Sequence, residues 1–243
     1  MTSNYATSTH AGATGQPPPV PGRRLLAALG IWVAVAGTAG AATYYLVAAM
    51  APSWATGANL GALISAEVYL ALVIVFIAVI GRPLAWRTPT RRDLAHGVLA
   101  ALAVWAAVTV VYLAIWPLLG SLDGLFEVLT FIGTDGGRIG TVGVALAVLS
   151  IARAVVITPL AEELLFRGAL FGWLRRHWPV WPTIAVTAAA FAAVHGFLML
   201  MPAAVVFGIV TAWLRERTGA VAAGFVAHVL SNAMLVTVIT VVT

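Results

Sequence analysis

Two adjacent carboxylates and an arginine stand inside an apolar stretch of this 243-residue chain: Glu162 and Glu163, followed by Arg167. Each charge near the centre of a membrane helix costs roughly 2.5–3.5 kcal/mol. Such groups are therefore retained where they are paired with an opposite charge, reach water or serve a function. Glu163 and Arg167 are four residues apart, in the favourable order for a helical ion pair. Glu162 points toward a different neighbour, and a free carboxylate suits general-base chemistry. The alternative is a structural ion pair at an interfacial helix end.

Two further pairs of polar or aromatic residues follow at helical spacing. Phe191 and His195 are four apart in an alanine-rich stretch, and His228 and Asn232 are four apart in the last apolar run. Either pair alone could simply hold helices together through hydrogen bonds. Taken with Glu162, they supply a base, two imidazoles and hydrogen-bond donors, which can activate water and stabilise an oxyanion.

The composition predicts an integral membrane protein built from helices. The chain is 62% hydrophobic and 9% charged, with a mean hydropathy of +1.01. Its apolar runs are continuous over about 20 residues, unlike the alternating strands of a membrane barrel. The absence of cysteine excludes disulfides, a thiol nucleophile and cysteine-ligated metal. All 13 basic residues are arginine and lie mostly at the ends of apolar runs, which favours contact with anionic lipid over nucleic acid.

The pattern of apolar runs predicts an all-α membrane bundle of about six to eight helices. Residues 1–22 are rich in Gly, Pro, Ser and Thr and are expected to form a disordered cytoplasmic tail. We expect amino-terminal membrane helices within 23–138 and a catalytic membrane core within 139–243. The individual spans are expected at 23–50, 60–80, 94–116, 139–160, 182–201, 202–214 and 219–242.

Arginine placement predicts the orientation of these helices. Arginines precede the first, third and last spans and follow the fourth, at positions 23, 24, 82, 87, 91, 92, 175, 176, 215 and 217. The positive-inside rule then places the amino terminus in the cytoplasm. The segment 202–214 is short for a span, and we expect either a buried helix or half of a re-entrant pair.

Three local questions stay open at this point. Thr158 and Pro159 either start a new helix or kink one that continues from the fourth span. Glu67, a carboxylate in an otherwise apolar span, serves either function or helix packing. The acidic stretch 117–138 is interpreted as a solvated external loop or interfacial helix without a chemical role.

The ordered motifs Glu-Glu-x-x-x-Arg, Phe-x-x-x-His and His-x-x-x-Asn resemble the CPBP family. This family comprises CAAX proteases, including the type II CAAX prenyl endopeptidases, and bacteriocin-processing or abortive-infection proteins. The resemblance covers roughly residues 140–243, and no motif position departs from the pattern. It implies an intramembrane endopeptidase that acts on a membrane-associated protein or peptide. The arginine-only, alanine-rich composition suggests a bacterial inner or plasma membrane.

The resemblance also implies a role for each motif residue. Glu162 would activate the attacking water with help from His195, while His228 and Asn232 would form the oxyanion hole. The supporting positions would be Glu163, Arg167 and Phe191.

Metal dependence is a separate question. We expect no cofactor, because the chain lacks His-Glu-x-x-His and asparagine is a poor zinc ligand. The zinc-dependent alternative would use Glu162, His195 and His228. Two other hypotheses are a non-enzymatic immunity or scaffold protein and a small transporter, although no inverted repeat supports the latter.

Overall fold

The computed structural model describes residues 20–50, 57–119, 148–195 and 200–242. Regular structure within these ranges is entirely helical, which confirms the predicted all-α bundle. The elements are α1 (Gly22–Met50), α2 (Gly57–Val79), η1 (Arg82–Leu84), α3 (Arg91–Leu119), η2 (Arg153–Ile157), α6 (Thr158–Glu163), η3 (Leu164–Leu170), α7 (Phe171–Leu174), α8 (Val180–Val194), α9 (Met201–Thr218) and α10 (Ala222–Val242). Most of the predicted tail and of the acidic stretch 117–138, with Asp123, Glu127 and Asp135, lies outside the described residues.

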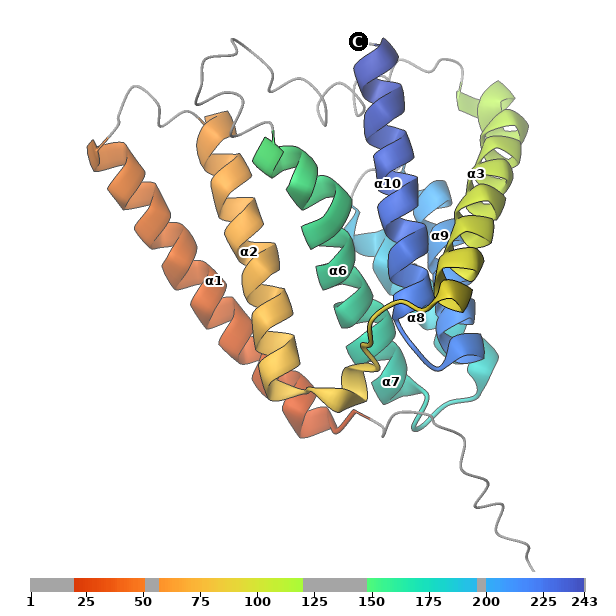
Figure 1. The fold of residues 1–243 in the computed structure, drawn as a ribbon, viewed down its shortest axis with the longest axis horizontal. Coiled ribbons are helices and arrows are strands. Elements are labelled where there is room, and N and C mark those ends of the chain that lie inside the picture. Colours follow the sequence, from red (N-terminus) through yellow and green to blue (C-terminus); the bar gives the residue numbers. More distant parts are fainter. Residues whose placement is uncertain (1–19, 51–56, 120–147, 196–199, 243) are drawn as a thin grey trace, which may run out of the picture.

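The helices pack in pairs around a central one (Figure 1). α1 and α2 lie side by side on one flank, and α10 and α3 lie side by side on the other. α6 stands between these pairs and contacts both α2 and α10. Behind this row, α8 packs against α9, which also packs against α3. The central helix is therefore covered from several sides.

The central helix extends beyond its expected end. It is helical from residue 148 through α7 without a break, whereas the sequence pattern predicted a span at 139–160. Pro159 lies inside this helix, so the helix continues through the proline instead of starting at it. The preceding turn, η2, is a wide π-helical segment. A proline ring clashes with the carbonyl four residues earlier, and a widened turn relieves that contact.

α8 and α9 pack against each other as a helical hairpin. α8 has 15 residues and reaches only to Val194, so the predicted span 182–201 is too long. α9 has 18 residues and extends past the predicted 202–214. At 1.5 Å per residue these helices are about 22 and 27 Å long, short of the roughly 30 Å hydrocarbon core. The buried helix and the re-entrant pair both stay predictions for this segment.

Several contacts bring the arginine-rich segments to the same end of the bundle. The Val221 amide donates a 3.1 Å hydrogen bond to the Ala85 carbonyl, which joins the start of α10 to η1. Arg175, after α7, forms a 2.9 Å ion pair with Glu216 in the last turn of α9. The carboxylate of Glu216 raises the pKa of Arg175 through this hydrogen bond. These arginine-rich segments, which we expected on one side of the membrane, therefore lie at one end of the bundle.

Helix packing depends on clusters of buried apolar side chains, and two of these clusters are larger than the others. One includes Phe76 and Leu84 with Leu164 of the central helix, and the other includes Phe191 and Phe207. Thr43 donates a 2.5 Å hydrogen bond to Glu67, so Glu67 joins α1 to α2, as its helix-packing interpretation requires. These buried contacts therefore hold the helices together.

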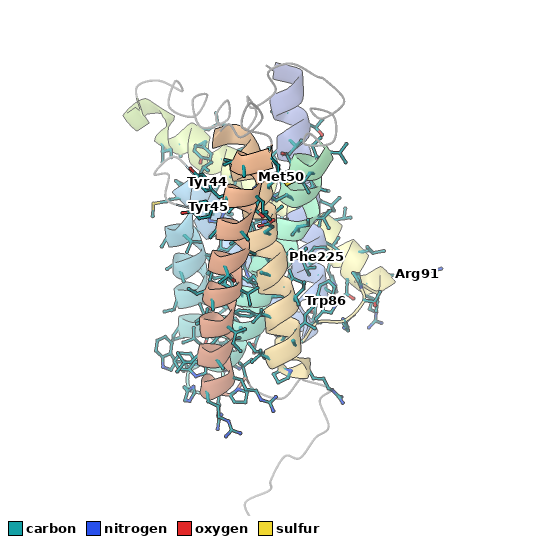
Figure 2. The ribbon with its side chains drawn as sticks, turned by 90° about the vertical axis from the view of Figure 1, so that its left-hand side faces the viewer. Tyr44, Tyr45, Met50, Trp86, Arg91 and Phe225 are labelled. Carbon is teal, nitrogen blue, oxygen red and sulfur yellow. The ribbon has the colours of Figure 1, made fainter. Side chains whose placement is uncertain are left out.

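The outer surface carries large apolar side chains. Within the described residues, α1 and the Arg91–Ile115 part of α3 are each long and apolar enough to cross a membrane. Figure 2 shows Tyr44 and Tyr45 toward one end of the molecule and Trp86 toward the other. Trp and Tyr prefer the two interfaces of a bilayer, so their placement fits a membrane-embedded bundle.

Candidate active site

The central helix places both glutamates near its middle. Glu162 is twelve residues before Leu174, or about 18 Å of helical rise. The alpha-helical α6 carries both carboxylates, and the π-helical η3 carries Arg167. We expected a span ending at 160, whereas the described helix continues for fourteen residues beyond that position. Wide π turns occur frequently at functional sites.

Glu163 and Arg167 form the ion pair predicted from their spacing. Arg167 Nη1 lies 3.0 Å from Glu163 Oε1, and both side chains are 0% exposed. The N–H directions do not meet hydrogen-bond geometry, so charge rather than a directed hydrogen bond holds this contact. Three aromatic rings surround the guanidinium carbon, at 4.3 Å for Phe191, 5.7 Å for Phe207 and 6.0 Å for Phe166. Glu163 is therefore neutralised locally, and Arg167 is stabilised by cation–π contacts.

Glu162 has a different environment and keeps some access. Its side chain is 13% exposed, and its Oε2 atom lies 3.6 Å from His228 Nε2. The other nitrogen of that ring, Nδ1, lies 3.3 Å from Glu163 Oε1. His228 on α10 thus stands between the two carboxylates. We expected His195 to assist Glu162, and that role stays a prediction; the imidazole in contact with Glu162 is that of His228.

α10 approaches Glu163 closely because Gly224 has no side chain. A Cβ built at Gly224 would lie 2.7 Å from Glu163 Oε2, which is too short for any real contact. The glycine lies one helical turn before His228 and on the same face. The absence of a side chain there brings the imidazole within reach of both carboxylates.

His195 lies at the end of α8 instead of inside a longer helix. It is the C-cap residue, and its Nδ1 is 2.7 Å from the Phe191 carbonyl. Because a carbonyl only accepts hydrogen bonds, Nδ1 carries the proton in the neutral ring and Nε2 is left as an acceptor. The His195 ring packs against Phe191 with ring centroids 4.5 Å apart, and the His228 ring lies 5.9 Å from the same phenylalanine. Phe191 therefore connects the two histidines.

Asn232 binds the central helix directly. Its Nδ2 atom donates a 2.8 Å hydrogen bond to the Ala154 carbonyl in η2. A π-helical turn shifts the internal hydrogen-bond pattern, which makes carbonyls available to partners on other helices. One N–H of the amide is used here, and the second is left for another acceptor.

The comparison with protein families agrees with this arrangement. Residues 144–234 match the family described as type II CAAX prenyl endopeptidase Rce1-like. This region is an Rce1-like domain. The match covers less than half of the chain but contains all three motifs, and it confirms the family resemblance of the sequence. No curated protein and no solved structure gave a significant match.

The Rce1-like family, which this region matches, is a family of membrane-embedded proteases. The domain contains Glu162 and Asn232 near opposite ends of the matched region. The structure brings Glu162, Glu163, Arg167 and His228 into direct contact and places His195 beyond Phe191. The individual chemical roles stay predictions.

Three further residues contact the candidate site, although no sequence motif marks them. Phe207 stacks on His228 with ring centroids 4.5 Å apart, and Gly224 provides the space described above. Arg215 was expected to be a topology arginine, but it is nearly buried and its Nε donates a 3.2 Å hydrogen bond to the Arg167 carbonyl. No local pattern marks these residues, because each acts on another helix.

The zinc-dependent alternative requires Glu162, His195 and His228 to converge on one point. No group of three or more His, Asp or Glu in the described part of the chain is placed to hold a metal ion together. His195 directs Nδ1 to its own helix, and His228 stands between two carboxylates. The residues do not fit a shared zinc ion in this conformation, so no reaction step is assigned to one. Metal independence itself stays a prediction.

Proposed function

We propose that this protein is an intramembrane endopeptidase that hydrolyses a peptide bond of a membrane-associated protein or peptide. Glu162 accepts a proton from water while the water oxygen attacks the scissile carbonyl carbon. The carbonyl oxygen becomes an oxyanion, the C–N bond breaks, and the departing nitrogen takes up the transferred proton. The products are a free carboxylate and a free amine.

The unequal environments of the two glutamates carry this proposal. Glu163 is 0% exposed and neutralised by Arg167, whereas Glu162 keeps 13% exposure and no arginine contact in the described structure. A general base must be reachable by the proton that it abstracts. Glu162 meets this condition, and Glu163 acts by positioning His228 and Arg167.

The two histidines have different roles in the reaction. His195 exposes an unprotonated Nε2 in its neutral form and assists Glu162 in taking a proton from water. His228 donates a hydrogen bond to the oxyanion from Nε2, the ring nitrogen on the side of Glu162, and Asn232 donates one from the second N–H of its amide. Removal of one oxyanion-hole donor typically costs about 10²–10³ in kcat.

The membrane orientation belongs to the same proposal. The arginine-rich face lies in the cytoplasm of a bacterial inner or plasma membrane, and the α8–α9 hairpin enters from that face. The hairpin places His195 about 22 Å from the start of α8, and Glu162 is about 18 Å from the end of α7. These similar depths favour a site within the membrane that is open to water from the cytoplasmic side.

Substitution of the two proposed bases tests the function. Glu162→Ala and His195→Ala are each expected to abolish cleavage, with membrane insertion and elution as a folded species retained. Glu163→Gln is the matched control, because it changes the adjacent carboxylate and is expected to act mainly on stability. Membrane peptides from wild-type and Glu162→Ala cells are compared by mass spectrometry to identify the substrate. Full activity in Glu162→Ala would eliminate the proposed mechanism.

A further inference from the structure

A groove lies between the start of α1 and the end of the central helix, at the arginine-rich end of the bundle (Figure 1). It has a volume of about 260 Å³ and is lined by Gly22, Leu25 and Leu26 of α1, with Leu170 of η3 and Trp173 of α7. The atoms that face it are apolar, and Leu26 is 72% exposed, so the groove opens to the outside of the bundle. Such a space is a poor site for water, because an ordered water needs about two to four polar partners. It fits a segment of hydrocarbon chain.

Two glycines bring the walls of this groove together. A Cβ built at Gly22 would lie 3.1 Å from Trp173 Nε1, and one built at Gly172 would lie 3.0 Å from Val20 Cγ2. These distances are tighter than ordinary contacts, so the start of α1 packs this closely against α7 because both side chains are absent. α1 is long and apolar enough to cross a membrane, and the groove lies at its first turns. Since tryptophan prefers the bilayer interface, the groove lies at the level of the headgroups and upper acyl chains.

Both walls of the groove continue into exposed arginines. Arg23 and Arg24 directly follow the glycine of the α1 wall. Arg176 follows the α7 wall, and its amide donates a 3.2 Å hydrogen bond to the Trp173 carbonyl. In the part of the chain that the structure describes, none of these three guanidinium groups forms an ion pair, whereas the adjacent Arg175 is already paired. Three uncompensated positive charges therefore lie next to the apolar groove.

We propose that this groove binds one anionic phospholipid from the leaflet on the arginine-rich side. An acyl chain lies between Leu26 and Leu170. The headgroup phosphate binds to Arg23, Arg24 and Arg176, because a guanidinium presents a planar fork of N–H groups that matches phosphate oxygens. In a zwitterionic lipid a cation on the headgroup offsets the phosphate, so the anionic lipid is preferred. A soluble phosphate ester would leave the groove uncovered, and binding therefore needs both parts of the lipid.

Native mass spectrometry of the full-length protein in detergent tests this site without any need for peptide hydrolysis. The protein is titrated with phosphatidylglycerol and, separately, with phosphatidylcholine that has the same acyl chains. A basic residue near an anionic lipid contributes about fivefold in affinity, so the first phosphatidylglycerol should bind about 10–100-fold tighter than the first phosphatidylcholine. Glycerol phosphate has the headgroup chemistry without acyl chains, and a large excess of it is expected not to displace the lipid.

Substitution of the arginines assigns the headgroup preference. Arg23→Gln combined with Arg24→Gln is expected to lower the affinity for phosphatidylglycerol about 5–25-fold and to leave that for phosphatidylcholine nearly unchanged. Arg91→Gln combined with Arg92→Gln is the matched control, because it removes the same two charges from exposed positions at the start of α3. The control protein is expected to keep the wild-type affinity for the first phosphatidylglycerol.

Substitution in the groove assigns the binding of the acyl chain. Leu26→Ser is expected to lower the affinity for both lipids about 3–30-fold, since it removes apolar contact area from the groove. Leu94→Ser is its control, because Leu94 is also exposed and follows Arg91 by three residues, as Leu26 follows Arg23. All four variants replace exposed side chains, and gel filtration checks that each elutes as the wild-type protein does.

Equal affinity of the wild-type protein for the two lipids would overturn the proposal before any variant is made. Displacement of the lipid by glycerol phosphate would also overturn it, because the headgroup would then bind without the groove. The same conclusion follows if the arginine pairs of α1 and α3 have equal effects on phosphatidylglycerol binding, or if Leu26→Ser and Leu94→Ser have equal effects on both lipids.

Discussion

Replacement of Arg167 by methionine is expected to destabilise the protein strongly. The substitution leaves Glu163 at 0% exposure beside His228, with its arginine partner gone. Breaking a buried ion pair from one side costs about 3–5 kcal/mol, because the other charge is left uncompensated. The loss of the cation–π contact at 4.3 Å from Phe191 adds about 0.5–2 kcal/mol. The unfolding equilibrium should therefore shift by at least about 10²-fold.

The same reasoning predicts a large rescue in the double variant. Glu163→Gln with Arg167→Met removes both charges, and replacement of a whole buried pair by neutral groups is often nearly neutral. The double variant should therefore recover most of the loss, with a coupling energy of about 2–3 kcal/mol in the double-mutant cycle. Unfolding of the four proteins by steric trapping in bicelles or by titration with SDS measures this coupling.

The Arg175–Glu216 pair provides the matched comparison. It is also an Arg–Glu contact, but its side chains are 31% and 24% exposed. An exposed pair contributes about 0–1 kcal/mol, so Arg175→Met should have a small effect. If Arg167→Met and Arg175→Met shift unfolding equally, or if the double variant is as unstable as Arg167→Met, the buried pair does not have the energetic role argued above.

The remaining predictions concern helix contacts and metal. Gly224→Ala forces a Cβ to within 2.7 Å of Glu163 Oε2 and should cost about 1–3 kcal/mol together with activity, whereas Gly37→Ala, with open space around it, should be neutral or slightly stabilising in the same unfolding assay. Asn232→Ala removes the bond to the Ala154 carbonyl and should cost about 1–3 kcal/mol, with a further loss of kcat in peptide hydrolysis. Prolonged treatment with chelators should leave hydrolysis unchanged, and its loss with recovery on adding zinc would restore the metal hypothesis.

Local contacts were predicted from the sequence more accurately than helix ends. The Glu163–Arg167 pair follows from the four-residue spacing on one helix, which needs no knowledge of neighbouring helices. The end of α8 at Val194 was missed because the apolar character continues beyond it, so hydropathy marks no boundary there. The end of the central helix was also missed, because Pro159 is compatible with both a helix start and an interior position.

Only some of the contacts between helices could be predicted from the sequence. The three motifs identified His228 and Glu162 as members of one site, yet their contact depends on how α10 packs against α6. Gly224 and Arg215 had no signal of their own, because a glycine in a membrane helix and an arginine at its end are both common. Their function becomes visible only when Glu163 and the Arg167 carbonyl lie against them.

The two π-helical segments also set the rotational phase of the central helix. η2 and η3 flank α6, and a π turn holds one more residue than an α turn, which rotates the rest of the helix by about 100°. Removal of one residue from Arg153–Ile157 would therefore rotate the preceding part of the helix by about 100° relative to Glu162, with no change in any motif. Insertions and deletions of a single residue, which point substitutions do not sample, are a separate means of changing which side chains this helix presents to its neighbours. A relative one residue shorter in this segment would present a different side chain to α2 over an otherwise unchanged pair of glutamates.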